Sequence, residues 1–157
     1  MTQYSRSVAR WRVLLSNAGF RIWGTFSPKL ICRGVRVVAL QSEGPAASCL
    51  EKVAAALDLI AAVDPVGERR VHRYLSQITV LNIGASLGWY WRNLNACFIS
   101  GAHVRDAAVS DIAETILHEA VHARITRAGL HSTSTTRDRI EAMCRAEQAR
   151  FRSLVSQ

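Results

Sequence analysis

Residues 110–129 constrain the fold more than any other part of this chain, because they leave few purely polar positions along a helical pattern. Their apolar members are Ile112, Ile116, Leu117, Ala120, Val121, Ile125 and Ala128. Ser110 suits the N-cap, with Asp111 and Glu114 near the positive end of the helix dipole. Gly129 suits the end of the helix. A helix with so little polar surface must be enclosed by other elements, so we expect it to be largely buried.

The segments before this helix predict the strands of an α+β fold. Residues 30–40 are typical of one strand, because Val35, Val37 and Val38 alternate in part with arginines. Residues 78–83 and residues 89–100 are joined by a glycine-bearing turn. We therefore expect these two segments to form an antiparallel hairpin.

Further helices are predicted on both sides of the hairpin. Residues 48–63 are rich in Ala and Leu and stop at Asp64, so they predict a helix, and residues 68–75 predict a further turn or two. A last helix is expected from about residue 135 to residue 155. Its apolar stripe consists of Ile140, Met143, Cys144, Phe151, Leu154 and Val155.

No internal repeat or linker divides the sequence, so we expect a single domain over residues 1–157, with residues 1–29 as a poorly defined N-terminal extension. No apolar stretch is long enough to cross a bilayer, and the N-terminus has no signal-peptide pattern. We expect a cytoplasmic protein with no membrane partner, and the sequence does not indicate an oligomeric state. The four cysteines form no Cys-x-x-Cys pair, which favours buried, reduced thiols.

The chain has a formal net charge of +8, and only Lys29 and Lys52 among its 20 basic residues are lysines. This charge suits an anionic partner such as nucleic acid. The arginines are spread over the whole chain, however, so nucleic acid is the less favoured partner.

The central helix contains a pattern with chemical meaning, His118-Glu119-Ala120-Val121-His122. Residues four apart lie above one another on a helix, so His118 and His122 can bind one cation. Glu119 lies about a third of a turn away and can face a water in the open coordination position. A catalytic zinc ion usually has three protein ligands, so a third ligand must come from elsewhere.

This pattern resembles that of the zincin metallopeptidases, and in particular the gluzincins, whose third ligand is a glutamate on a following helix. The resemblance implies a small zincin-like domain, in which a mixed or antiparallel sheet packs against the active-site helix and a C-terminal helix. Glu141, nineteen residues after His122, stands at about the family's spacing. Glu147 is a rival, because an unpaired carboxylate in the apolar stripe would be costly. Asn95 to Phe98 resemble the edge strand that binds extended peptide in thermolysin-like members.

The resemblance implies hydrolysis of peptide bonds by a Zn²⁺-activated water, with Glu119 as the general base that later protonates the leaving amine. A donor for the oxyanion is also needed. His131 is preferred, because its loop follows the helix, and His103, Tyr90 and Tyr74 are alternatives. One position departs from the family: Arg145 stands where thermolysin-like enzymes have a supporting aspartate.

The residues leave several alternatives open. Asp111, Glu114 or Asp138 could orient a ligand histidine in place of the missing aspartate. Trp89 and Trp91 alternate along a strand, which is typical of core residues or of a substrate wall. The chain could also be a basic nucleic-acid-binding or regulatory domain with a structural metal, or a toxin-like hydrolase that acts on one dedicated protein.

Overall fold

A computed structural model describes residues 26–40, 44–82, 86–130 and 135–157. The described residues form an α+β domain with one five-stranded mixed sheet. Its strands are β1 (Lys29–Cys32), β2 (Val35–Ala39), β3 (Gln77–Leu81), β4 (Gly88–Trp91) and β5 (Ala96–Ser100). They lie in the order β1-β2-β3-β5-β4. The central pairs β2–β3 and β3–β5 are parallel, whereas the outer pairs β1–β2 and β4–β5 are antiparallel.

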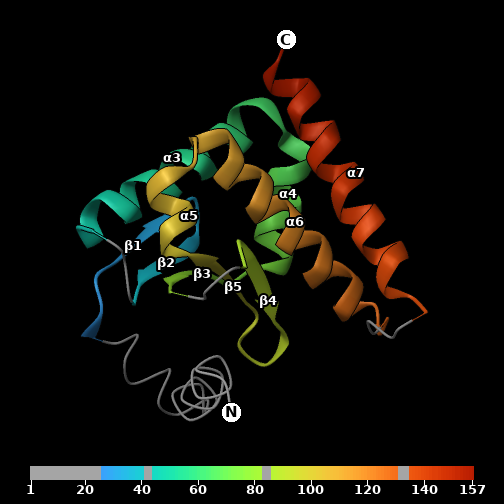
Figure 1. The fold of residues 1–157 in the computed structure, drawn as a ribbon, viewed down its shortest axis with the longest axis horizontal. Helices are drawn as coiled ribbons and strands as arrows, with labels where there is room; N and C mark the ends of the chain where they lie inside the picture. Colours follow the sequence, from blue (N-terminus) through green and yellow to red (C-terminus); the bar gives the residue numbers. More distant parts are fainter. Residues whose placement is uncertain (1–25, 41–43, 83–85, 131–134) are drawn as a thin grey trace, which may run out of the picture.

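Helices connect and cover these strands (Figure 1). They are α3 (Ala46–Val63), α4 (Pro65–Tyr74), α5 (Gly101–Asp106), α6 (Val109–Arg127) and α7 (Arg137–Val155), with a 3-10 turn, η1 (Arg92–Leu94), between β4 and β5. The predicted helices over residues 48–63, 110–129 and 135–155 are confirmed with shifted ends. Asp64 both ends α3 and begins α4, where its carboxylate accepts a hydrogen bond from the Gly67 N–H at 2.9 Å.

The main core lies between one face of the sheet and the helices α3 to α6. Alternate residues of the central strands point into it, as the two-residue period of a strand requires. These strand residues are Val35, Val37, Ile78, Val80, Cys97 and Ile99. The prediction that residues 110–129 form a largely buried helix is confirmed, because α6 is buried along most of its length. Figure 1 shows α7 lying along α6, at the outside of the helical layer.

The other face of the sheet carries an aromatic cluster. The rings of Trp89 and Phe98 are stacked with centroids 4.9 Å apart, and Trp91 lies 5.8 Å from Phe98. The tryptophans are partly buried and pack against this cluster, on the face of the sheet away from α6.

Three of the sequence-based expectations about the strands are wrong. Residues 30–40 form two strands, because Arg33 and Gly34 take φ values of 47° and 73° and turn the chain back on itself. Residues 89–100 are likewise two strands, separated by Asn95 at φ 48°. The strand at residues 77–81 pairs with β5 in the parallel sense, so the predicted antiparallel hairpin lies instead between β4 and β5.

Candidate metal centre

The two histidines of the sequence pattern lie on the exposed side of α6, one turn apart. Their Nε2 atoms are 3.1 Å apart, and the ring centroids are separated by 4.9 Å. Both side chains are partly covered, with 19% and 24% of their surface exposed for His118 and His122. The helix therefore aims one nitrogen of each ring at the same small volume.

The next helix brings a carboxylate to the same place. Glu141, in the second turn of α7, has one oxygen 3.5 Å from His118 Nε2 and the other 3.4 Å from His122 Nε2. The small residue Ala142 follows it, and α7 packs closely on α6 through Val121, Ile125, Ile140 and Cys144. The structure thus brings together the three residues that the sequence analysis selected as metal ligands.

These distances fit a tetrahedral zinc site. Ligand atoms about 2.0–2.1 Å from one zinc ion, at the corners of a tetrahedron, lie about 3.3–3.4 Å from each other. The two Nε2 atoms are 3.1 Å apart, and each faces a different oxygen of the Glu141 carboxylate, at 3.5 and 3.4 Å, so the separations lie near that value. Two histidines and one glutamate are also a ligand set of catalytic zinc. Geometry and donor chemistry therefore both fit the metal that the resemblance implies.

A fourth side chain reaches the same volume. The Cys144 Sγ lies within 4.8 Å of one ring nitrogen of each histidine, and the residue is fully buried. Burial, together with the negative charges of Glu141 and Glu119, raises the pKa of the Cys144 thiol to about 12. Without a metal, this residue is a neutral thiol, a poorer ligand than the Glu141 carboxylate.

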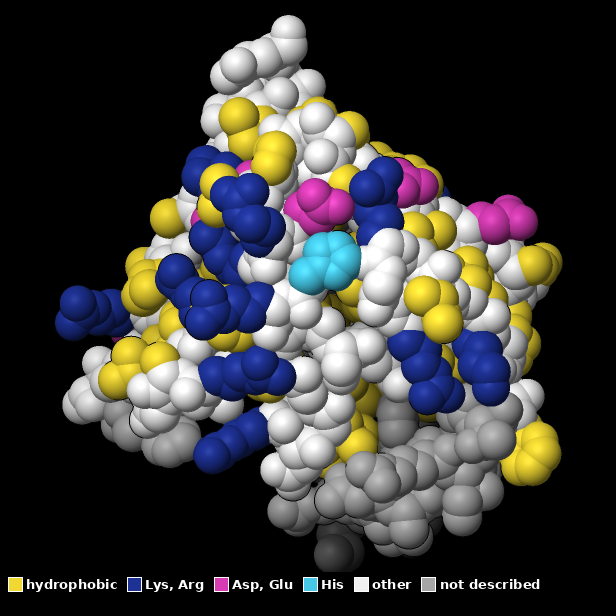
Figure 2. Space-filling view, turned by 180° about the vertical axis from the view of Figure 1, so that it is seen from behind, with side chains coloured by type: hydrophobic (Ala, Val, Ile, Leu, Met, Phe, Trp, Pro, Cys, Tyr) yellow, Lys and Arg dark blue, Asp and Glu magenta, His cyan; other side chains and the backbone are white. Residues whose placement is uncertain are grey.

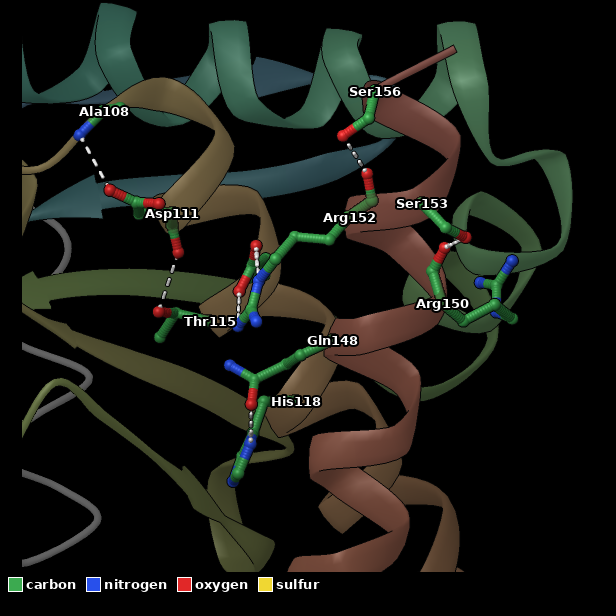
Figure 3. A network of polar contacts seen from close by, with 10 residues as sticks. Ala108, Asp111, Thr115, His118, Gln148, Arg150, Arg152, Ser153 and Ser156 are labelled. Atoms are coloured by element: carbon green, nitrogen blue, oxygen red, sulfur yellow. Dashed lines mark hydrogen bonds and ion pairs between the residues drawn. The ribbon is translucent and has the colours of Figure 1, made fainter.

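Gln148 holds the His118 ring from the side away from Glu141. The Nδ1 of His118 is 3.3 Å from the Gln148 Oε1, which accepts the ring proton when that nitrogen carries it (Figure 3). This arrangement leaves Nε2 unprotonated, as a metal ligand requires. Sequence reasoning missed Gln148. The available signal was its position seven residues after Glu141, two turns along the same face of α7.

Figure 3 shows a second contact between the same helices, one turn further along. Both guanidinium nitrogens Nε and Nη2 of Arg152 donate to the Glu114 carboxylate at 2.7 Å. Glu114 therefore fixes the packing of α7 on α6 and does not orient a histidine. Asp111 is also engaged elsewhere, because its carboxylate accepts from the Ala108 N–H at 3.3 Å. This contact places the N-cap of α6 at Ala108, so the prediction of Ser110 as the cap is wrong.

Glu119 lies behind the histidines, against β4, and only 5% of its surface is exposed. Burial and the nearby Glu141 raise its pKa from 4.5 to about 8, although a hydrogen bond from the Tyr90 backbone N–H acts in the opposite direction. Strand β4 approaches α6 very closely at this point. A Cβ added to Gly88 would lie 3.4 Å from the Glu119 Oε1 and 2.9 Å from the Thr115 Cγ2. A glycine inside a strand is the sequence signal for such an approach.

The electrostatic surroundings favour the neutral form of the second histidine. Burial lowers the pKa of His122, and His118 lowers it further, against the opposing effect of Glu141. A neutral imidazole is the form that binds metal ions. His122 is therefore ready to act as a ligand near neutral pH.

The structure places the rival ligand, Glu147, away from this centre. Its carboxylate forms ion pairs with Arg70 of α4 and with Arg150, the latter at 2.6 Å. Arg150 also pairs with Asp64 at the start of α4. The buried carboxylate of Glu147 is thus satisfied by arginines and joins α7 to α4.

None of the described candidates for an oxyanion donor is placed beside the paired histidines by its hydrogen bonds. The His103 Nε2 is 3.0 Å from the Thr115 hydroxyl, and the Tyr90 hydroxyl is 3.0 Å from the side-chain amide of Asn95. The Tyr74 ring lies under two arginine side chains. The preferred candidate, His131, lies outside the described residues. Arg145 is exposed on α7, one turn after Glu141.

The expectation that residues 95–98 form a peptide-binding edge strand is wrong. They open β5, which has β3 on one side and β4 on the other, so its backbone groups are engaged in the sheet. Asn95 itself lies in the turn before β5, where its amide contacts Tyr90. Among the described residues the edge next to α6 is β4, the strand that touches Glu119.

None of the four cysteines forms a disulfide; Cys49, Cys97 and Cys144 are buried, and Cys32 is partly exposed. In the described parts of the chain no helix combines the length and apolarity that a membrane span requires. No protein-family model, curated protein or solved structure matches the chain.

Proposed function

We propose that this protein is a zinc-dependent metallopeptidase, in which His118, His122 and Glu141 hold the metal and Glu119 is the general base. The observation that carries the proposal is the convergence of two Nε2 atoms and one carboxylate, with separations of 3.1 to 3.5 Å. The glutamate that follows the first histidine adds chemical specificity, because a purely structural site has no use for it.

Different contacts hold the ligand side chains in position. His118 is oriented by Gln148, and both histidines are fixed by the rigid backbone of α6. Glu141 is positioned by the packing of α7 on α6. Zinc bound to these residues would supply Lewis acidity, which lowers the pKa of a water molecule and polarises the carbonyl group of the substrate.

Glu119 is suited to take a proton and return it. Its pKa of about 8 applies to the protein without a metal. A divalent cation held by the neighbouring ligands would favour the carboxylate form and bring this pKa down towards neutrality. A base with a pKa near the working pH is the most effective at both steps, removal of the proton from water and its transfer to the leaving amine.

The substrate is an extended peptide that pairs with the outer edge of β4, the side that is not paired with β5. This strand is hydrogen-bonded to β5 on one side, and it contacts Glu119 through Gly88 and Tyr90. A peptide added to this edge by β-augmentation would pass close to the catalytic base. The family's mode of binding is thus retained, but on a different strand from the one that the sequence indicated.

The proposal is tested by measuring zinc content and hydrolysis of a fluorogenic peptide library with the purified protein. We expect one zinc ion per chain. Glu119→Gln should retain the zinc and lose at least 100-fold in hydrolysis, because a general base typically contributes 10²–10⁴-fold. Glu141→Ala should lose the zinc. Glu51→Gln, at an exposed position of α3, is the matched control and should change neither property.

Two outcomes would contradict this assignment. Full hydrolytic activity in Glu119→Gln would remove the proposed base. Unchanged zinc affinity in Glu141→Ala would show that the third ligand is another residue, with Cys144 the nearest alternative.

The proximity of Cys144 favours one other function. A fourth protein ligand would close the coordination sphere, and a closed tetrahedral site is typical of structural zinc. The protein would then be a domain whose α6–α7 pair is held by the metal. Cys144 separates the two functions, because only the structural site needs its sulfur.

A further inference from the structure

A cluster of arginines lies at the far end of the helical layer from the C-terminus. Arg73 lies in the last turn of α4, Arg127 ends α6, and Arg92 opens η1. The guanidinium carbons of Arg73 and Arg127 are 5.7 and 5.8 Å from the centre of the Tyr74 ring. Arg92 and Arg127 both act electrostatically on Tyr90. Three positive charges therefore gather around two tyrosines.

Among the described residues, neutral groups hold this cluster in place. The Arg127 Nη1 donates to the backbone oxygen of Arg73 at 2.9 Å. In the orientation that satisfies its neighbours, the Asn95 amide accepts from the Arg127 Nη2 at 2.8 Å and donates to the Tyr74 backbone oxygen at 2.6 Å. Because these partners carry no negative charge, they do not offset the positive charges of the arginines, which repel one another.

Several arginines elsewhere in the described part of the chain are paired with acids. Arg33, Arg70, Arg105, Arg150 and Arg152 each form an ion pair with an aspartate or glutamate. No ion pair between the described residues involves Arg73, Arg92 or Arg127. The three arginines of the cluster therefore differ from these five ion-paired arginines.

The cluster continues along the surface of α4. Arg69 and Arg73 line a shallow hollow together with His72 and Glu68. On the face of the molecule drawn in Figure 2, Lys and Arg side chains form a column down one side, whereas the acidic side chains lie near the upper end. A column of this kind is longer than the binding site of a single small anion.

We propose that this arginine face, defined by Arg69, Arg73, Arg92 and Arg127, binds the phosphodiester backbone of nucleic acid. The planar guanidinium fork matches the oxygens of a phosphate group, and it is more weakly hydrated than a lysine ammonium. A column of such groups suits a polymer with regularly spaced phosphates. The arginines read no base edges, so binding is independent of sequence and falls steeply with salt.

The test uses the full chain and fluorescein-labelled oligonucleotides of about twenty nucleotides, single-stranded and duplex, in anisotropy titrations at several salt concentrations. Removal of one phosphate-binding arginine should reduce the slope of log K against log salt by about 0.9 on duplex or about 0.7 on single strands. The triple variant R73Q/R92Q/R127Q should therefore lower the slope by about 2–3 and weaken binding at least 10-fold at low salt. The affinities for the two oligonucleotides at the same salt concentration identify the preferred form of nucleic acid.

Two further variants test whether weaker binding comes from unfolding or from the loss of net charge alone. R73Q/R92Q leaves the hydrogen bonds of Arg127 intact, so it should weaken binding while preserving the thermal unfolding curve. R33Q/R105Q removes the same charge from two ion-paired arginines and should leave affinity within about 2-fold. Binding should be the same with and without a zinc chelator, so the result is independent of the proposed metallopeptidase activity.

Three outcomes would overturn the proposal. R33Q/R105Q could weaken binding as much as R73Q/R92Q, which would mean that only net charge matters. Polyglutamate could compete as well as an unlabelled oligonucleotide, which would remove the role of phosphate. Vesicles containing phosphatidylserine could bind through the same arginines while oligonucleotides do not, which would identify a membrane surface.

Discussion

The Nδ1 of His118 lies 3.3 Å from the Oε1 of Gln148, so α7 contributes a partner to each side of the same imidazole ring. Glu141 approaches the other nitrogen, Nε2, from two turns earlier on the helix. The packing of α7 on α6 therefore decides both the tautomer of His118 and the position of the third ligand. A metal bound here couples the two helices.

Replacement of Gln148 by alanine should weaken zinc binding without removing the site. The ring loses the acceptor that holds its proton on Nδ1, and partners of this kind typically contribute 10–100-fold to metal affinity. The affinity is measured by competition with a chromophoric chelator. Gln148→Glu should bind zinc at least as tightly as the wild type, because a carboxylate is a stronger acceptor. Gln157→Ala, at the exposed C-terminus, is the control, and a wild-type affinity in Gln148→Ala would disprove the role of this hydrogen bond.

Replacement of Cys144 by alanine distinguishes an open metal site from a closed one. In an open site the sulfur is not a ligand, so zinc affinity should remain within about 3-fold of wild type. The smaller buried side chain should reduce the free energy of unfolding by about 1 kcal/mol. A fall in affinity of 100-fold or more would instead establish Cys144 as the fourth ligand and favour the structural site.

The helices of this site were predictable from sequence because their signals are local. Apolar periodicity defines α6, and the His-Glu-x-x-His pattern depends only on the geometry of one helix. The two-turn spacing between Glu141 and Gln148 is also local. An exposed glutamine on a helix, however, has no feature that separates it from one that holds a histidine.

The sheet was less predictable because its order depends on distant pairings. The turn at Arg33 and Gly34 requires positive φ at a non-glycine residue, a conformation that arginine rarely adopts, so residues 30–40 were interpreted as one strand. The identity of the edge strand depends on which strands pair, and no single strand sequence encodes it. For this reason the sequence analysis wrongly placed residues 95–98 at the edge of the sheet.

The metal-free protein should become less stable as the pH rises towards 8. The pKa of Glu119 is raised from 4.5 to about 8, so between these values the folded state retains a proton that the unfolded chain releases. The stabilising contribution is therefore complete below pH 4.5 and is lost as the pH rises through about 8. Glu119→Gln cannot ionise and should lose this dependence, so it should unfold at a higher temperature than wild type above about pH 8.

Thermal unfolding in the presence of a chelator, at intervals from about pH 5 to about pH 9, measures this effect. Glu51→Gln should follow the wild-type curve. Saturation with zinc should flatten the wild-type dependence, because a bound cation favours the ionised carboxylate. Parallel curves for wild type and Glu119→Gln without metal would show that Glu119 has an ordinary pKa.

The close approach of Gly88 in β4 to α6 predicts that a larger side chain at this position reduces catalysis. A Cβ on Gly88 would lie 2.9 Å from the Thr115 Cγ2 and 3.1 Å from the Phe98 backbone oxygen. Gly88→Ala should therefore move β4 away from Glu119 and reduce the free energy of unfolding by about 1–3 kcal/mol. Hydrolysis should fall about 10-fold or more, because a misplacement near 1 Å is sufficient for a loss of that size.

A second substitution shows whether this close approach is the cause. Thr115→Ser removes only the methyl group and retains the hydroxyl that donates to the Asp111 backbone oxygen at 3.0 Å. In the double variant G88A/T115S the added methyl has room on that side, so stability and activity should recover in part. The Phe98 backbone oxygen still lies close to the new methyl, which limits the recovery. The double variant could instead lose the sum of the stability losses of the two single variants. Such additivity would show that the methyl groups at positions 88 and 115 do not clash, and that the small size of Gly88 is not the reason why β4 lies close to Glu119.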